Sequence, residues 1–112
     1  MRISDIADSI DLKLVSGANG FSNEIKGAYV SDLLSDVMGN AGEGYIWITL
    51  QTHQNIIAVA ALKDLAAVIL VRGNMPDNDT IEKSNQEGIP VFSTQLDTFT
   101  VSGKLFNILK KA

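Results

Sequence analysis

Three uninterrupted apolar runs constrain the fold of this chain more than any other feature of its sequence. The runs are YIWITL, AAVILV and IPVF, and they predict strands at Tyr45–Leu50, Ala66–Val71 and Ile89–Ser93. None of them alternates apolar with polar residues, as a strand with one face in water would. Continuous runs are typical of parallel strands that helices cover on both faces. The pattern therefore predicts a parallel sheet in an α/β layer fold.

The segments between and after these runs have the periodicity and the capping residues of helices. They predict helices at His53–Leu62, Asp77–Glu87 and Thr98–Lys110, with links short enough for right-handed crossovers. The earlier part of the chain predicts a helix at Ile3–Ile10, strands at Leu12–Val15 and Ile25–Val30, and a helix at Leu33–Met38 that Ser31 and Asp32 cap. We expect one domain over residues 1–112, a three-layer sandwich in which helices flank a mostly parallel sheet.

The charge balance and the lack of cysteine argue against several classes of function. The net charge is −4, so the clustered Lys and Arg side chains of a sequence-independent nucleic-acid binder are missing. Without cysteine there is no disulfide, thiolate metal site or cysteine nucleophile.

The longest apolar run, Ile56–Val71, is interrupted by Lys63 and Asp64 and is shorter than a membrane helix, which needs about 20 residues. No apolar signal region follows Met1-Arg2, so we expect a cytoplasmic protein.

A polar segment follows each of the three apolar runs. These segments, residues 49–55, 72–77 and 93–98, are expected to meet, because the carboxyl ends of parallel strands lie at one edge of a sheet. Helix N-termini lie beside them, and their N–H groups and dipole favour anions. The predicted ligand-binding residues are Thr49, Gln51, Thr52, His53, Asn55, Gly73, Asn74, Ser93, Thr94 and Thr98. The alternative is that Thr52, Asp77 and Asp97 only cap helices.

His53 is the only histidine of the chain, and three roles are open to it. It could contact a ligand, act as a base with Ser93 and Asp32 or Asp97, or be a structural residue near the helix start. A metal held by His53, Asp32 and Asp97 has no ligand spacing to support it. No nucleophile-elbow sequence surrounds Ser93, and no GxxxxGK[ST] loop for phosphate occurs. We therefore predict no catalytic residue, metal or cofactor, and do not expect an enzyme.

Four blocks of the sequence carry a family resemblance. They are YVSDLLSDVM, GYIWIT, ILVRGNMP and PVFSTQLDTF, which begin at Tyr29, Gly44, Ile69 and Pro90. In this order and spacing they resemble the DRTGG domain and the similar N-terminal domain of bacterial HPr kinase/phosphorylase, over a range from Ile25 to Leu109. The eponymous residues differ, because Thr52-His53 stands where the family has Asp-Arg and Val71-Arg72-Gly73 where it has Thr-Gly-Gly.

The resemblance implies a non-catalytic regulatory or ligand-sensing module. Similar domains are fused to phosphotransacetylases and to nucleotide-regulated CBS-domain pyrophosphatases, where they do not supply the catalytic residues. A small anion or a nucleotide at the carboxyl edge of the sheet is therefore the expected ligand. The form TxQTHxN also resembles short stand-alone proteins encoded near iron hydrogenases and other electron-transfer proteins. This keeps an alternative open, in which the chain is a ligand-free interaction subunit or scaffold of a redox enzyme.

The distribution of apolar residues predicts a homodimer. The predicted helix His53–Leu62 is apolar nearly all round, whereas a helix on one face of a sheet needs only an apolar stripe. The last helix adds Phe99, Leu105, Phe106 and Ile108. A single chain of this size can bury so much apolar surface only if its core uses all of it. We expect a symmetric homodimer, because two-fold dimers are the commonest soluble oligomers.

Overall fold

The centre of the molecule is a five-stranded sheet with the order β1-β5-β4-β3-β2. A computed structural model describes residues 1–111 of the chain. The strands are β1 (Lys13–Ser16), β2 (Gly27–Val30), β3 (Tyr45–Thr49), β4 (Ala67–Leu70) and β5 (Val91–Ser93). Strands β2 to β5 run parallel, and β1 pairs antiparallel with β5. The predicted common direction of the three apolar runs, and the mostly parallel sheet, are confirmed.

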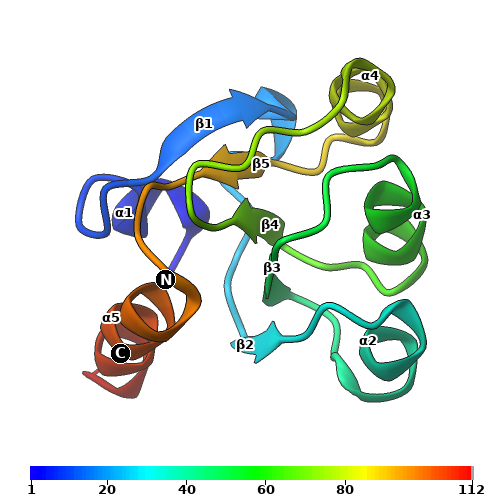
Figure 1. The fold of residues 1–112 in the computed structure, drawn as a ribbon. Helices are drawn as coiled ribbons and strands as arrows, with labels where there is room; N and C mark the ends of the chain where they lie inside the picture. The colour runs from blue at the N-terminus through cyan, green and yellow to red at the C-terminus, as the bar shows by residue number, and fades with distance from the viewer. Residues whose placement is uncertain (112) are drawn as a thin grey trace.

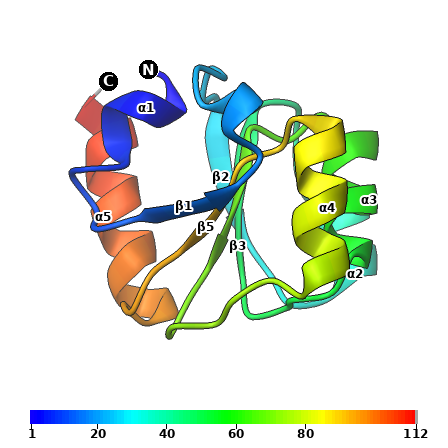
Figure 2. The same ribbon diagram turned by 90° about the horizontal axis from the view of Figure 1, so that it is seen from above.

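Helices cover both faces of this sheet. Helices α1 (Ile3–Ile6) and α5 (Thr98–Lys111) lie on one face, and α2 (Leu34–Asn40), α3 (Asn55–Leu62) and α4 (Asn78–Glu87) lie on the other (Figures 1 and 2). Successive residues of β3 point to opposite faces, so Ile46 and Ile48 join the core under α1 and α5 while Trp47 joins the core under α2 and α3. The predicted three-layer sandwich is therefore confirmed.

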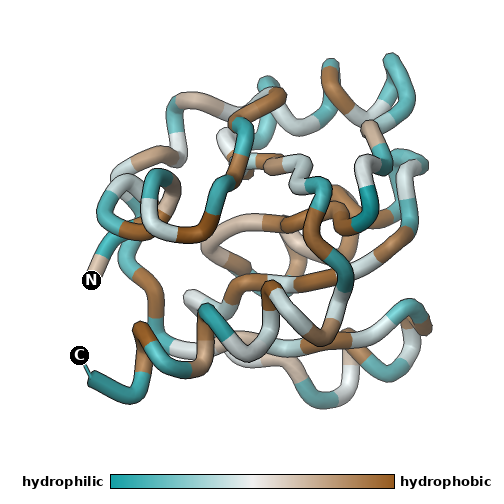
Figure 3. Tube along the Cα trace, turned by 60° about the vertical axis from the view of Figure 1, so that its left-hand side comes forward, coloured by the Kyte–Doolittle hydropathy of each residue, from teal (hydrophilic) through white to brown (hydrophobic). Residues whose placement is uncertain are grey.

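The apolar residues lie where this arrangement requires them. Figure 3 shows apolar segments running through the middle of the molecule and polar segments in many of the outer turns. A short 3₁₀ turn, η1 (Ala18–Gly20), follows β1 within the predicted loop. Within the described residues, none of the helices has both the length and the apolar character needed to cross a bilayer.

Some predicted helix starts are wrong by one or two residues. The hydroxyl of Ser31 accepts a hydrogen bond from Leu33 N at 3.1 Å, in a turn that precedes α2. The carboxylate of Asp32 binds Thr49, 2.7 Å away on β3, and Leu33 takes the N-cap position with no side-chain cap. Helix α3 begins at Asn55 and not at the predicted His53, whose carbonyl accepts Ile56 N in a turn.

The apolar character of α3 has an explanation within one chain. Helix α3 lies between α2 and α4 and also covers the sheet, so it needs apolar residues on three sides (Figure 1). Its side chains Ile56, Ile57, Val59 and Ala60 are all buried. The exposed Leu62 stands at its C-terminal end. The apolar character of α3 therefore does not require a second copy, and the homodimer stays a prediction that only the last helix supports.

Candidate functional site

The three polar segments meet at the carboxyl edge of the sheet, as the sequence predicts. Leu70 pairs with both Thr49 and Ser93, so β3, β4 and β5 end side by side. Backbone hydrogen bonds then join the segments, from Asp77 N to Thr52 O at 3.0 Å and from Gly73 N to Thr94 O at 2.8 Å. The segments therefore form one continuous rim, which we define as residues 49–55, 72–77 and 93–98.

Three of the predicted ligand-binding residues are buried and use their hydroxyls inside the rim. Thr49 Oγ1 donates to Asp32 Oδ1 at 2.7 Å, and Ser93 Oγ donates to the carbonyl of Asn74 at 2.8 Å. The hydroxyl of Thr94 accepts a hydrogen bond from Leu96 N at 3.2 Å. These side chains hold the loops in position. A ligand could bind their hydroxyls only if these internal hydrogen bonds broke.

Asp32 fixes part of the rim by hydrogen bonds, whereas its sequence context predicts a helix cap. Its Oδ1 accepts hydrogen bonds from Thr49 Oγ1 and from Leu50 N at 2.8 Å. Its backbone carbonyl accepts one from Gln51 Nε2 at 2.6 Å. Asp32 lies after β2 and is 17 residues away from Thr49 in the chain. No local pattern could have indicated this role, because it depends on β2 lying next to β3.

Replacing Asp32 with alanine is expected to lower the free energy of unfolding by about 1–3 kcal/mol, since the buried Thr49 hydroxyl and the Leu50 N–H lose their acceptor. Urea unfolding followed by the fluorescence of the single tryptophan, Trp47, measures the loss. The exposed Asp8 serves as the matched control, and Asp8→Ala is expected to change the unfolding free energy by about 0.5 kcal/mol or less. Equal losses in the two variants would contradict this role of Asp32.

The exposed side chains of the rim include one cation, Arg72, two carboxylates, Asp77 and Asp97, and several uncharged hydrogen-bonding groups. His53 and Asn55 are exposed at the start of α3, and Arg72 is exposed directly after β4. Arg72 has a left-handed backbone with φ of 58°, a conformation that side chains other than glycine adopt at a cost. Its neighbour Gly73 is left-handed as well, with φ of 73°. Arg72 was not among our predicted site residues, although its place beside the predicted Gly73 could have indicated it.

The capping alternative is right for one residue and wrong for two. Asp97 caps α5, because Thr100 N donates to its Oδ1 at 2.8 Å. Hydrogen bonds from Thr100, together with the nearby charge of Arg72, hold the pKa of the Asp97 carboxyl below its ordinary value. Asp77 stands at the N-cap position of α4 without a side-chain cap, and Thr52 contributes only its carbonyl, which accepts Thr80 Oγ1 at 2.7 Å.

The remaining predicted residues support the rim or lie at its margin. Asn74 Nδ2 donates to Val71 O at 2.8 Å and holds the turn after β4. Gln51 is half-buried, and Thr98 is half-buried at the first position of α5. Within residues 1–111 no group of three or more histidine and carboxylate side chains is placed to hold a metal ion. The structure therefore does not bring His53, Asp32 and Asp97 together as a metal site.

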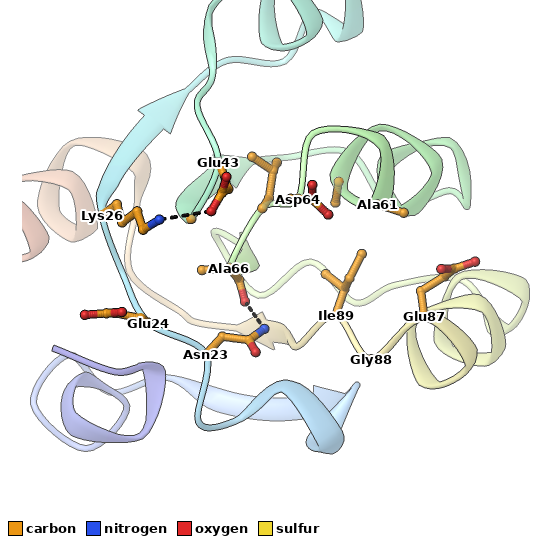
Figure 4. A pocket seen from close by; sticks show the side chains of 13 residues that line it. Asn23, Glu24, Lys26, Glu43, Ala61, Asp64, Ala66, Glu87, Gly88 and Ile89 are labelled. Atoms are coloured by element: carbon orange, nitrogen blue, oxygen red, sulfur yellow. Dashed lines mark hydrogen bonds and ion pairs between the residues drawn. The ribbon is translucent and has the colours of Figure 1, made fainter.

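A hollow lies at the opposite, amino-terminal edge of the sheet. It has a volume of 630 Å³, and its acidic lining residues are Glu24, Glu43, Asp64 and Glu87 (Figure 4). Its cation, Lys26, pairs with Glu43 at 2.9 Å, and that hydrogen bond raises the pKa of the ammonium group. Four carboxylates against one ammonium group oppose an anion there. The rim exposes two carboxylates and one guanidinium group, so it is the less acidic of the two places and the better candidate for an anionic ligand.

The fold and the rim define a class of α/β domain, a three-layer sandwich with a mostly parallel sheet and polar loops gathered at its carboxyl edge. The chain matches the DRTGG domain family over residues 5–108. It belongs to that family, as the four sequence blocks predict.

One solved structure shows the fold of this family. It is the crystal structure of the CBS and DRTGG domains of the regulatory region of Clostridium perfringens pyrophosphatase, complexed with its activator diadenosine tetraphosphate. The TM-score is 0.74 at 21% sequence identity, and the match covers 93% of the present chain and 45% of that one. The present chain therefore spans less than half of the regulatory region that it matches. No curated protein matches it in sequence.

Proposed function

We propose that this DRTGG domain is a non-catalytic regulatory module that binds a small anionic ligand, such as the phosphate groups of a nucleotide, at the rim. The observation that carries the proposal is the convergence of the three loops, which presents exposed Arg72, His53 and Asn55 at one edge of the sheet. A guanidinium group suits phosphate because it is permanently charged and offers several donors in a fixed plane. The module is proposed to act as a homodimer.

Two further observations support this proposal. Thr52-His53 and Val71-Arg72-Gly73 stand where the family has its eponymous residues, and both segments lie at the rim. The positions that distinguish the family thus gather at the proposed site. In addition, the pyrophosphatase regulatory region was solved with a dinucleotide activator. An adenine nucleotide is therefore a rational first probe for the present chain.

A thermal-shift screen with ATP, ADP, AMP, pyrophosphate and inorganic phosphate tests the proposal. A ligand that binds only the folded chain should stabilise it by about 2.7 kcal/mol at a concentration of 100 times its dissociation constant. We expect Arg72→Gln and His53→Ala to lose most of this stabilisation, because they remove the cation and a hydrogen-bonding group. Isothermal titration calorimetry then measures the dissociation constant for each variant.

Lys63→Gln is the matched control for this screen, since Lys63 follows α3 at the opposite edge of the sheet. It removes the same charge from the chain as Arg72→Gln but should leave ligand binding unchanged. Equal weakening by both variants would mean that only net charge matters, which would contradict a site at the rim. The absence of stabilisation by every probe would favour the alternative, an interaction subunit or scaffold of a redox enzyme.

A further inference from the structure

Helix α5 carries two apolar stripes, whereas packing on one sheet face requires only one. The first stripe includes Val101 and Leu105, which are buried in the core of the molecule. The second consists of Phe99, Gly103 and Phe106, at the spacing i, i+4 and i+7 of one helix face. Phe99 is 89% exposed and Phe106 is 64% exposed. The second stripe is therefore apolar surface that the described chain leaves largely uncovered.

A groove of 820 Å³ lies between this second stripe and strand β2. The β2 side of the groove is lined by Gly27, Ala28 and Val30. Among the described residues that line the groove, only Lys110 is charged. Strand β2 is the last strand of the sheet, so one of its edges has no neighbouring strand. Figure 1 shows this open edge between α5 and α2. The face thus combines two protruding aromatic rings with an apolar hollow beside them.

No atom of the described residues requires glycine at position 103. A Cβ atom added at Gly103 would meet nothing within 4 Å. Glycine inside a helix is unfavourable, because it adds conformational entropy to the unfolded chain and contributes no side chain. Here it stands between Phe99 and Phe106 on the exposed stripe. A helix surface with a glycine between two large side chains allows the backbone of another helix to approach closely.

We propose that this face, formed by the second stripe of α5 and the groove along β2, binds the same face of a second copy of the chain. The proposal rests on the homodimer of the proposed function and specifies its interface. The two α5 helices would run antiparallel and cross at Ser102 and Gly103. Phe99 and Phe106 are equally far from that point in the sequence, so each Phe99 would meet Phe106 of the partner subunit. Aromatic pairs of this kind contribute beyond the area that they bury.

The chemistry of the face fits a copy of itself better than an unrelated partner. An interface around a two-fold axis must be self-complementary, and this face offers both the protrusions and the hollow that receives them. None of the described residues that line the groove carries a carboxylate, so the groove itself adds no negative charge to the contact. In the antiparallel arrangement, Lys110 would also approach the exposed carboxylate of Asp97, the residue before the other α5.

The area of the face agrees with a dimer of ordinary size. At about 200 Å² for a phenylalanine, the exposed parts of Phe99 and Phe106 amount to roughly 300 Å² per copy. A standard interface buries about 800 Å² per partner. The two rings would thus supply over a third of it, and the edge of β2 and the flank of α5 around Lys110 would supply the rest.

Sedimentation velocity over a concentration series tests the proposal. We expect the wild type to dimerise, and the double variant Phe99→Ser/Phe106→Ser to be a monomer with an unchanged far-UV circular dichroism spectrum. Gly103→Leu should weaken dimerisation at least tenfold, because its side chain would stand where the helices cross. Gly39→Leu is the matched control, since Gly39 is also in a helix, α2, with open space around its Cβ position. It should leave the dimerisation constant unchanged.

The possible failures of this experiment are distinguishable. A wild type that stays monomeric at its highest soluble concentration would overturn both this interface and the proposed homodimer. A dimer that persists unchanged in the double variant and in Gly103→Leu would overturn this interface alone. Equal weakening by Gly103→Leu and Gly39→Leu would also overturn it, because the effect would then not depend on α5. Ligand binding at the rim is measured separately by the thermal-shift screen.

Discussion

Replacing Trp47 with alanine is expected to lower the free energy of unfolding by about 3–5 kcal/mol, the usual cost of deleting a large buried side chain. Trp47 is fully buried at the centre of the core that α2 and α3 cover. Its Nε1 also donates a hydrogen bond of 2.8 Å to the carbonyl of Ser31, which precedes Asp32 at the rim. The substitution should therefore weaken both the core and the support of the candidate site.

Because Trp47 is the only tryptophan, the unfolding of this variant has to be followed by circular dichroism in urea. Trp47→Phe separates the two contributions, since it keeps most of the apolar volume and loses the hydrogen bond. A smaller loss of about 1–3 kcal/mol is expected for it. The control is Leu62→Ala on α3, where the side chain is 70% exposed and the change should be about 0.5 kcal/mol or less. A Trp47→Ala loss as small as that of the control would contradict the packing described here.

Gly17→Ala is expected to lower the free energy of unfolding by about 3 kcal/mol or more, although it adds only one methyl group. Gly17 has a left-handed backbone with φ of 75°, and an added Cβ would lie 2.0 Å from the carbonyl oxygen of Ile89. That carbonyl accepts Ser84 Oγ at 2.7 Å, and Ser84 Oγ in turn accepts the hydroxyl of Ser16 at 2.9 Å. The methyl group would therefore break a buried hydrogen-bond chain that joins β1 to α4.

Urea denaturation followed by Trp47 fluorescence measures this loss, and the soluble yield of the variant gives a second readout. Gly39→Ala is the matched control, because an added Cβ on this helical residue meets nothing within 4 Å. We expect it to stabilise the chain by up to about 1 kcal/mol through the better helix propensity of alanine. If Gly17→Ala were as stable as Gly39→Ala, the close approach of Gly17 to Ile89 would be refuted.

That the three polar segments meet at one edge could be predicted from the sequence, because it depends only on the direction of the strands. A polar segment after a buried parallel strand has to lie at the carboxyl edge, so Thr49, Gly73 and Ser93 were placed at one rim without coordinates. Which of these side chains face solvent could not be predicted. The hydroxyls of Thr49 and Ser93 turn inward to Asp32 and to the carbonyl of Asn74, and both partners are distant in the chain. The exposed cation, Arg72, was not predicted either, although it lies in the predicted segment 72–77 beside Gly73.

The sequence by itself determined the class of fold, the common direction of the three strands after residue 44, and the family. Apolar periodicity and short connections are local properties, and they suffice for those conclusions. Tertiary structure alone decided that α3 is enclosed by its own neighbours and that the uncovered apolar surface lies on α5 beside β2. Burial depends on which elements become neighbours in space, and the same apolar pattern is compatible with a core position and with an exposed interface.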